Sequence, residues 1–248
     1  MGNLDGKTAV VTGGSRGIGR AVVQRLASDG ATVVFSYATD ERAAKAVEAG
    51  SPRARAVRAD MANLADIQRL FSSADEYFTD AGPGKVLDIL VNNAGISSAA
   101  PVSEVSEADY DRVMAVNAKG PFFVLQHAAT RMRTGGTVIN VSTLGTVWPS
   151  PGEALYAASK AALEQFTRIA SREFGHRGIR VNTVSPGPTD TDMLRAAVPA
   201  ETFDNVARMT ALGRLGRPAD IANVVAFLAG PDAGWLTGQN IHADGGLT

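Results

Sequence analysis

Tyr156 and Lys160 are the side chains whose types and spacing best fit catalysis. They stand four residues apart in the run YAASK, within a stretch of helical spacing, so both would lie on one face of a helix. A free tyrosine has a pKa of about 10 and is a slow proton donor at neutral pH, and a nearby ammonium lowers that pKa. The spacing therefore predicts a tyrosine acid assisted by a lysine. A surface tyrosine and lysine at helical spacing is the competing interpretation.

Two polar residues upstream could complete this site. The apolar run GGTVINVS ends at Ser142, fourteen residues before Tyr156. A strand end followed by a helix start would place the Ser142 hydroxyl beside the phenol, at the sheet edge where ligands bind. Asn117 lies inside a long helical pattern, where its amide competes for backbone hydrogen bonds, and this suggests a functional task. The alternative for Asn117 is a tolerated polar residue near a bend at Gly120 and Pro121.

A glycine-rich turn near the N-terminus predicts a dinucleotide site. The run TAVVTGGSRGIG carries an apolar strand into the turn and then into a helix. Glycines let the chain turn tightly and bring backbone N–H groups close to a pyrophosphate, and the helix start adds partial positive charge. An ordinary turn between a strand and a helix is the alternative, but the strand before and the helix after are the context that a dinucleotide site requires. The expected contacts are Gly13, Ser15, Arg16, Gly17, Ile18 and Gly19.

The end of the second strand bears on the choice of dinucleotide. A site that prefers NAD places an Asp or Glu there to bind the adenosine ribose, whereas this strand ends in Ser36 and Tyr37. Arg16 lies in the glycine turn, where a guanidinium can grip a 2′-phosphate. The sequence therefore predicts NADP(H) as the cofactor. The alternative for Arg16 is that it only covers the surface of the turn.

Asp60 and Met61 follow the third predicted strand. The Asp60 carboxylate could accept a hydrogen bond from the adenine amino group, and Met61 could supply a backbone N–H. From the local sequence, Asp60 could equally be the N-cap of the next helix.

Parallel strands must bring these motifs to one edge of a sheet. Short runs rich in Val and Ile alternate with segments of helical spacing, as strands buried on both faces do when helices cross between them. The predicted strands are residues 7–11, 32–36, 54–59, 87–91, 136–141, 179–184 and 239–242. The predicted helices are residues 17–28, 40–49, 63–79, 107–131, 154–175 and 218–229. This predicts an α/β fold, a doubly wound Rossmann-type domain with a mostly seven-stranded parallel sheet and helices on both faces.

The whole chain, 1–248, fits one domain, because its length lies within the range of a single core and it contains no repeat or linker. Gly82, Pro83 and Gly84 predict a loop ahead of a strand rather than a domain boundary. Residues 188–216 lack strict periodicity and predict a mobile lid over the site.

Composition and charge exclude several classes of protein. The net charge is −1 with scattered charges, which implies neither a nucleic-acid partner nor an anionic membrane surface. The chain has no cysteine, and its three histidines lie at least 49 residues apart, so no metal site is expected. Since neither a signal peptide nor a membrane-spanning stretch is evident, we expect a soluble, cytoplasmic protein.

As a set, these motifs resemble the short-chain dehydrogenase/reductase family, classical type. The matching elements cover the chain in order and are TGGSRGIG at 12–19, NNAG at 92–95, Asn117, Ser142, YAASK at 156–160 and PG at 186–187. The resemblance implies that Tyr156 is the general acid and that Lys160 lowers its pKa and holds the nicotinamide ribose. It also implies that Ser142 binds the reacting oxygen and that Asn117 anchors a water that feeds protons to Lys160.

The resemblance also implies contacts along the cofactor cleft. Asn93 would touch the adenosine-side ribose. Thr189 through its backbone and Thr191 through its hydroxyl would meet the nicotinamide carboxamide and the pyrophosphate. The remaining residues expected to line the cleft are Asn92, Ala94, Gly95, Pro186 and Gly187.

The substrate stays open between two classes of ketone. Within the family the chain is similar to 3-oxoacyl-[acyl-carrier-protein] reductases, in which basic residues near the active-site mouth dock an acidic carrier, and Arg133 and Arg172 would take that role unless they are ordinary solvated arginines. The alternative is a ketoreductase or alcohol dehydrogenase for a free small molecule. Its apolar wall would be Leu144, Val147, Trp148 and Leu155.

Two features depart from the family pattern: Thr143 follows the serine, and the segment LGTVWPSPGEAL is rich in proline. The resemblance further implies a homotetramer that pairs the long helices near 107–131 and 154–175. A nucleotide-sensing scaffold without catalysis is the non-enzyme alternative, and it should lack the tyrosine or the lysine, both of which are present.

Overall fold

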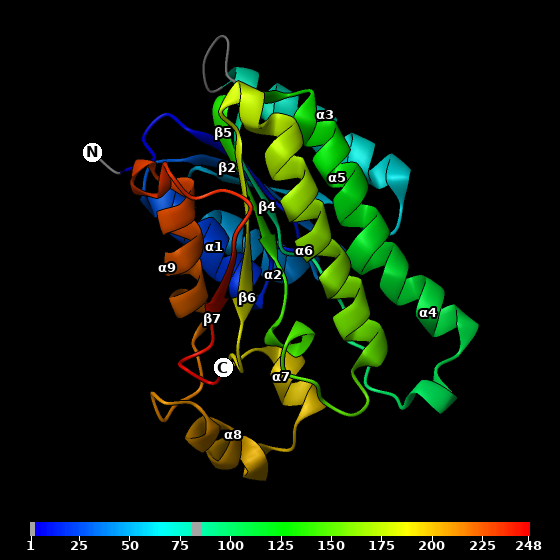
Figure 1. Cartoon of the computed structure of the whole chain (residues 1–248). Coiled ribbons are helices and arrows are strands. Elements are labelled where there is room, and N and C mark those ends of the chain that lie inside the picture. Colours follow the sequence, from blue (N-terminus) through cyan, green and yellow to red (C-terminus); the bar gives the residue numbers. More distant parts are fainter. Residues whose placement is uncertain (1–2, 81–85) are drawn as a thin grey trace.

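The computed structural model describes residues 3–80 and 86–248, so the predicted loop at Gly82, Pro83 and Gly84 lies outside the described residues. Seven parallel strands form one sheet in the order β3-β2-β1-β4-β5-β6-β7 (Figure 1). The strands are β1 (Thr8–Val11), β2 (Thr32–Tyr37), β3 (Ala54–Arg58), β4 (Leu87–Asn92), β5 (Met132–Val141), β6 (Arg180–Pro186) and β7 (Asn240–Ala243). The strand order reverses between β1 and β4, so a crevice forms at the carboxyl ends of these two strands.

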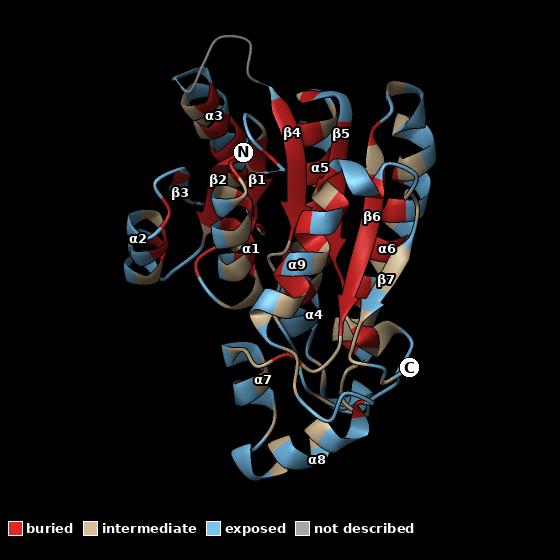
Figure 2. Ribbon diagram, turned by 90° about the vertical axis from the view of Figure 1, so that its left-hand side faces the viewer, coloured by how far each residue is buried: buried red, intermediate tan, exposed pale blue. Residues whose placement is uncertain are grey.

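Helices cover both faces of the sheet. Figures 1 and 2 show α1, α2 and α9 on one face and α3, α5 and α6 on the other. The α-helices are α1 (Gly17–Ser28), α2 (Glu41–Ala49), α3 (Leu64–Asp80), α4 (Glu107–Met114), α5 (Gly120–Ala129), α6 (Ala154–Phe174), α7 (Asp192–Ala197), α8 (Phe203–Met209) and α9 (Pro218–Ala229). The shorter helical turns are η1 (Val102–Glu104), η2 (Ala115–Lys119), η3 (Leu144–Thr146), η4 (Gly175–Arg177), η5 (Ala200–Thr202) and η6 (Pro231–Ala233). The predicted doubly wound architecture is confirmed.

Strand residues alternate between two apolar cores. Ala9 and Val11 pack into the core shared with α1, α2 and α9, whereas Val10 packs into the core shared with α3, α5 and α6. Val33 and Phe35 of β2 alternate with Val34 in the same way. Because successive side chains of a strand point to opposite faces, both faces of these strands must be apolar. Figure 2 shows the buried strands at the centre of the molecule.

Two predicted elements differ in the structure. The helix expected over 107–131 is present from residue 107 to residue 129, but it contains the π-helical turn η2 between α4 and α5. The fifth strand begins earlier than predicted, at Met132, and its pairing with β4 is irregular between Leu87 and Ile89. No helix among residues 3–80 and 86–248 is long and apolar enough to cross a membrane.

The segment 188–216, called the lid segment below, contains the short helices α7 and α8. These helices extend below the carboxyl ends of β6 and β7, near the C-terminus (Figure 1). Main-chain bonds tie the segment to the last residues of the chain, since the N–H of Leu212 donates to the carbonyl of Gly245 at 3.1 Å. Its mobility stays a prediction.

Candidate active site

The glycine turn joins β1 to α1 and leaves no room for side chains. Gly13 and Gly17 adopt φ values of +70° and +53°, a region that favours glycine. A Cβ on Gly13 would lie 2.9 Å from the Cα of Ala94, just after β4. The Thr12 hydroxyl accepts hydrogen bonds from the N–H groups of Asn93 and Ala94, both at 3.0 Å. The Thr12 side chain and the close approach of Gly13 to Ala94 therefore hold together the two strand ends that border the crevice.

Ser36 and Asn93 support this turn from within the protein. Ser36 is 1% exposed, and its hydroxyl accepts a hydrogen bond from the N–H of Gly13 at 3.0 Å. Ser36 therefore braces the turn, and its direct contact with the cofactor stays a prediction. The Asn93 amide donates to the carbonyls of Thr12 and Gly13 at 3.0 and 3.1 Å. Contact of Asn93 with the ribose stays a prediction, because only its amide nitrogen is used in these bonds.

Arg16 is exposed immediately before α1 and makes no side-chain capping bond to that helix. Tyr37 is half-buried at the end of β2, opposite Arg58 of β3. Ser15 is buried, and Ile18 packs against the core beneath α1. The turn thus leaves the Arg16 side chain exposed to solvent.

Asp60 and Met61 follow β3 as expected, but the helix cap lies elsewhere. The Asn63 side chain accepts the N–H of Ala65 at 2.9 Å, so Asn63 and not Asp60 caps α3. Asp60 accepts the N–H of Ala62 at 2.9 Å and pairs with Arg112 at 3.3 Å. Met61 is 4% exposed and its side chain belongs to the core. The adenine contacts of Asp60 and Met61 stay predictions.

The segment after β6 returns to the glycine turn. Pro186 ends β6, and the N–H of Gly187 donates to the carbonyl of Ala243 at 3.1 Å. Thr191 caps α7, and its methyl group would lie 3.4 Å from a Cβ built on Gly17. Thr189 is buried and its hydroxyl donates to Gly187 at 2.9 Å. The structure therefore brings the start of the lid segment to the turn that precedes α1.

Lys160 is buried at the centre of the site. It is 3% exposed, and its Nζ donates to the carbonyl of Val141, the last residue of β5, at 2.9 Å. Burial lowers the pKa of Lys160 to about 8. A Cβ on Gly95 would lie 3.1 Å from this Nζ and 3.4 Å from Oδ1 of Asn117. The glycine after β4 thus leaves space in which the lysine and the asparagine meet.

Tyr156 lies on the first turn of α6 with its phenol mostly buried. Burial raises the pKa of Tyr156 to about 12, a hydrogen bond with the Thr143 side chain lowers it, and the charge of Glu153 raises it further. Desolvation is the largest of these effects. The lowering of this pKa by Lys160 stays a prediction.

Thr143, not Ser142, is the hydroxyl beside the phenol. The Ser142 hydroxyl donates to the buried Glu164 carboxylate on α6 at 2.8 Å and lies 3.4 Å from the carbonyl of Lys160. Thr143 caps η3, accepts the N–H of Gly145 at 3.2 Å and hydrogen-bonds Tyr156. The predicted position of Ser142 beside the phenol is therefore wrong by one residue. The only signal in the sequence was the departure from the family pattern at Thr143.

Asn117 lies in η2 with its side chain fully buried. Its amide donates to the carbonyl of Ile96 at 2.8 Å and to Ser159 at 3.0 Å, and its Oδ1 accepts the N–H of Ile96 at 2.9 Å. This side chain therefore pairs with a backbone segment as a neighbouring strand would. Asn117, the polar residue predicted inside a helix, therefore lies in a π-helical turn of that helix. The water relay expected at Asn117 stays a prediction.

Comparison with known proteins identifies the family. A family model described as enoyl-(acyl carrier protein) reductase matches residues 13–248. A hydroxynaphthalene reductase-like protein, Arp2, of Metarhizium majus is 41% identical over 98% of this chain and 96% of its own length. The chain belongs to the short-chain dehydrogenase/reductase family, classical type.

Solved structures of other short-chain dehydrogenase/reductases superpose closely. The angucycline C-6 ketoreductase LanV, crystallised with bound NADP, is 44% identical, with a TM-score of 0.92 over 99% of this chain and 97% of its own. A second LanV structure contains NADP and rabelomycin. The cyclic-di-GMP-binding biofilm dispersal mediator protein of Escherichia coli is 39% identical over 99% of this chain and 98% of its own. The protein is therefore an oxidoreductase of this family.

The crevice of this dehydrogenase/reductase suits the dinucleotide that the family uses. The glycine turn packs closely against Ala94, and the N-terminus of α1 lies at the carboxyl ends of β1 and β4. The buried Lys160 lies close to Gly95, at the carboxyl ends of β5 and β4 in the same sheet edge. The glycine turn, Lys160 and Thr191 would hold such a cofactor.

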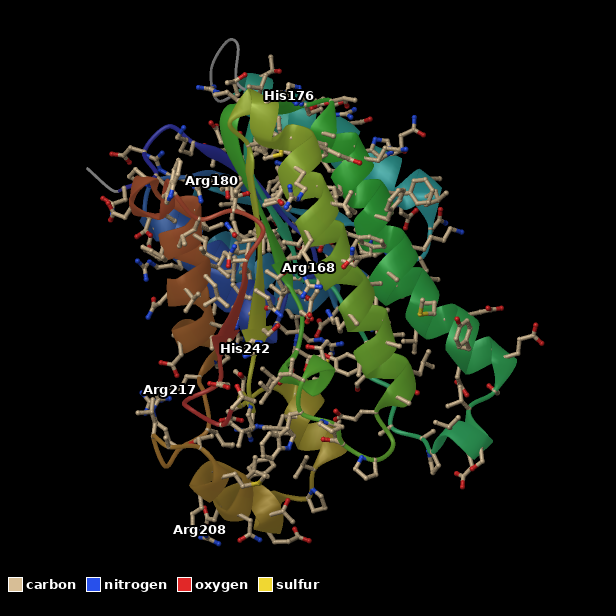
Figure 3. The ribbon with its side chains drawn as sticks, viewed as in Figure 1. Arg168, His176, Arg180, Arg208, Arg217 and His242 are labelled. Atoms are coloured by element: carbon tan, nitrogen blue, oxygen red, sulfur yellow. The ribbon has the colours of Figure 1, made fainter. Side chains whose placement is uncertain are left out.

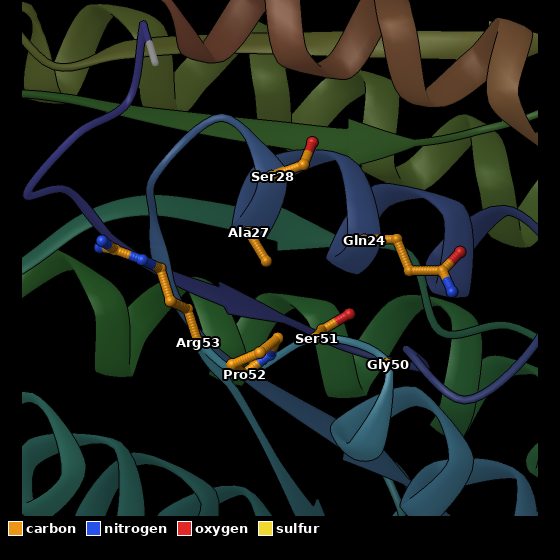
Figure 4. A pocket seen from close by; sticks show the side chains of 7 residues that line it. All are labelled: Gln24, Ala27, Ser28, Gly50, Ser51, Pro52 and Arg53. Atoms are coloured by element: carbon orange, nitrogen blue, oxygen red, sulfur yellow. The ribbon is translucent and has the colours of Figure 1, made fainter. Parts of the chain in front are cut away.

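The expected apolar wall is only partly open. Leu144 and Leu155 are 5% and 7% exposed and pack inside the protein, whereas Val147 and Trp148 are 50% and 41% exposed. The pocket in Figure 4 is not this site. It lies between the end of α1 and the residues before β3, at the opposite edge of the sheet, and is lined by Gln24, Ala27, Ser28, Gly50, Ser51, Pro52 and Arg53.

The two arginines expected at the active-site mouth lie far from it within the subunit. Arg133 stands at the start of β5 and pairs with the buried Asp88 at 3.3 Å, and the length of β5, roughly 30 Å, separates it from Ser142. Arg172 lies in the last turn of α6, about 24 Å along the helix from Tyr156. Neither arginine supplies a basic rim around the site of its own subunit.

Histidines are dispersed over the molecule. Figure 3 shows His176 and His242 at widely separated places. Among residues 3–80 and 86–248, no group of three histidine or carboxylate side chains is arranged to hold a metal ion.

Proposed function

We propose that this protein is an NADPH-dependent ketoreductase that converts a ketone into a secondary alcohol. The observation that carries the proposal is the juxtaposition of the Tyr156 phenol, the Thr143 hydroxyl and the buried Lys160 at the carboxyl edge of the sheet. The same edge holds a glycine turn that approaches Ala94 closely. Two relatives, the ketoreductase LanV and the hydroxynaphthalene reductase-like protein Arp2, support this reaction class.

Each residue of the site then has its own role in the reaction. NADPH, when bound, supplies the hydride that adds to the carbonyl carbon. Tyr156 donates the proton of its hydroxyl to the carbonyl oxygen, so that a secondary alcohol and a phenolate result. Thr143, in place of Ser142, hydrogen-bonds the carbonyl oxygen and the phenol. The Lys160 ammonium stabilises the phenolate and takes part in returning its proton.

The pH dependence of reduction should follow Lys160. We expect kcat/KM for a ketone to fall as the pH rises through about 8, the pKa of Lys160, because the neutral amine no longer stabilises the phenolate. Tyr156, with a pKa of about 12, stays protonated over this range. The check is kcat/KM with NADPH between pH 6 and 10, in buffers of constant ionic strength. A flat profile up to pH 10 would contradict the role of the lysine charge.

Arg16 should set the preference for NADPH over NADH. A charge-assisted contact contributes about 1.5–3 kcal/mol, which corresponds to roughly 10- to 150-fold discrimination. We expect Arg16→Ala to raise the KM for NADPH far more than that for NADH, and Tyr37→Asp to weaken NADPH further and help NADH. The measurement is kcat/KM for both cofactors with one ketone, with Arg20→Ala at an exposed position of α1 as a matched control. A parent enzyme that prefers NADH would refute the assignment of Arg16.

A free small-molecule ketone is the substrate class we favour. Val147 and Trp148 present apolar surface beside η3, and Arg133 and Arg172 lie far from the site of their own subunit. A 3-oxoacyl thioester carried by an acyl carrier protein is the second candidate, consistent with the description of the matching family model. NADPH oxidation measured against a panel of cyclic ketones, aliphatic ketones and 3-oxoacyl thioesters separates the two.

Two further expectations remain proposals. The homotetramer is supported by large apolar side chains at the surface, among them Phe122 of α5 and Ile169 of α6, which are 45% and 48% exposed. Nucleotide binding without catalysis is the alternative, supported by the cyclic-di-GMP-binding relative of Escherichia coli. The complete set of Tyr156, Lys160 and Asn117 argues for an enzyme.

A further inference from the structure

Glu153 is an acidic residue in the site to which the reaction assigns no task. It ends the proline-rich segment and precedes α6, three residues before Tyr156. Its backbone is bonded, since its N–H donates to Ser150 at 3.2 Å and its carbonyl accepts the N–H of Ala157 at 2.8 Å. Its side chain does not cap the helix. The fold therefore uses the backbone of Glu153 and leaves the carboxylate free for another role.

The carboxylate lies next to the reacting groups. A Cβ built on Gly145 would lie 3.1 Å from Oε2 of Glu153 and 3.6 Å from Oγ1 of Thr143, so the carboxylate and the hydroxyl flank the same glycine. Thr143 is the residue whose side chain hydrogen-bonds the Tyr156 phenol. The negative charge of Glu153 also reaches the phenol and raises its pKa. A molecule bound against Tyr156 and Thr143 would thus have Glu153 within reach.

In the protein without a bound molecule, Glu153 has two unfavourable effects. Its carboxyl is partly buried, and burial raises its pKa with no compensating contribution from a cation or a hydrogen-bond donor in the described part of the chain. A partly desolvated carboxylate without a donor is unfavourable. Its charge also makes Tyr156 a weaker acid. Both costs would fall if a bound molecule donated a hydrogen bond to the carboxylate.

We propose that Glu153 binds a hydroxyl group of the substrate close to the reacting ketone, so that the enzyme selects hydroxy ketones. This inference rests on the proposed ketoreductase function. The ketone oxygen lies against Thr143 and Tyr156, and the neighbouring hydroxyl donates to the Glu153 carboxylate. Val147 and Trp148, half-exposed after η3, contact the apolar part of the molecule. Glu153 is then a specificity residue and the proline-rich segment is the element that positions it.

The test compares matched ketones. The probes are 2-hydroxy-1-tetralone and 4-hydroxy-1-tetralone, each measured against its methyl ether, with kcat/KM for NADPH-dependent reduction as the readout. We expect the parent enzyme to favour at least one hydroxy ketone over its ether by roughly 10-fold or more, the range of a hydrogen bond to a charged group. Glu153→Gln and Glu153→Leu should bring that ratio close to one, mainly through KM. The exposed Glu76→Gln on α3 should keep it.

The ratio separates recognition from other effects of the substitution. Loss of the Glu153 charge also changes the acidity of Tyr156, but that change acts on the hydroxy ketone and its ether alike and cancels in the ratio. If Glu153 served only structure, or paired with a cation when the lid segment closed, both members of a pair would change together and the inference would be overturned. Equal kcat/KM values for both pairs in the parent enzyme would also overturn it, while leaving the ketoreductase function intact. Failure of every ketone to oxidise NADPH would overturn both.

Discussion

Replacing Tyr156 with phenylalanine should lower kcat for ketone reduction by at least about 100-fold, the typical contribution of a general acid. The ring stays in place, so the packing of α6 is retained, and only the proton donor is lost. Cofactor binding should change little, because the phenol is needed for proton transfer rather than for the glycine turn. The measurements are single-substrate kinetics with saturating NADPH and a fluorescence titration of NADPH binding.

Tyr110→Phe on α4 is the matched control for Tyr156→Phe, because Tyr110 is 52% exposed and takes no part in the site. The control should retain the activity of the parent. Substantial residual turnover in Tyr156→Phe would refute the assignment of the phenol as the acid. A loss of NADPH affinity equal to the loss of kcat would instead show that the substitution damages the cofactor site.

Thr143→Val should lower kcat/KM by roughly 100- to 1,000-fold, the effect of removing a hydrogen-bond donor from a developing oxyanion. Valine keeps the branched shape of threonine, so the loss reports on the hydroxyl. Ser142→Ala should cost less than about 10-fold, because the Ser142 hydroxyl faces Glu164 and not the phenol. The measurement is kcat/KM with NADPH and one ketone for the parent and both variants.

Ser142→Ala and Thr143→Val should also differ in their effect on the stability of the protein. Ser142→Ala leaves the buried Glu164 without its donor, and we expect a loss of about 1–3 kcal/mol in the free energy of unfolding, measured by denaturant titration. Thr143→Val should cost less stability, since the threonine hydroxyl braces only the short turn η3. The opposite pattern, with Ser142→Ala inactive and Thr143→Val active, would restore the assignment made from the sequence.

The exchange of Ser142 for Thr143 shows where sequence reasoning reaches its limit. Both hydroxyls follow the end of β5 and lie against α6, so the face of the sheet does not distinguish them. The spacing to Tyr156 indicated the right region but could not fix where β5 ends, which is at Val141. Only the contacts with Glu164 and with the phenol decide which hydroxyl enters the site.

The strands could be predicted because both of their faces are buried. The apolar runs around Val10 and Val34 have no other stable arrangement than a covered parallel sheet. The π-helical turn η2 between α4 and α5 could not be predicted, because its residue Asn117 pairs with the distant backbone of Ile96. The short helices α7 and α8 are also too brief for helical periodicity to show in the sequence.

Electrostatics of the site could be predicted only in part. The sequence places Lys160 one helical turn after Tyr156, but it does not reveal how deeply both are buried. Burial moves the two pKa values apart, to about 12 for Tyr156 and about 8 for Lys160. This separation, and not the spacing alone, determines which group titrates in the working range.

The depth of Lys160 has a practical consequence for coupling the protein to surfaces and dyes. Lys7 and Lys45 are 44% and 69% exposed and Lys119 is exposed on η2, whereas Lys160 is 3% exposed. Amine-reactive reagents should therefore attach at the outer lysines and spare the amine that the reaction needs. Immobilisation through surface amines is accordingly a suitable way to prepare this reductase for repeated use.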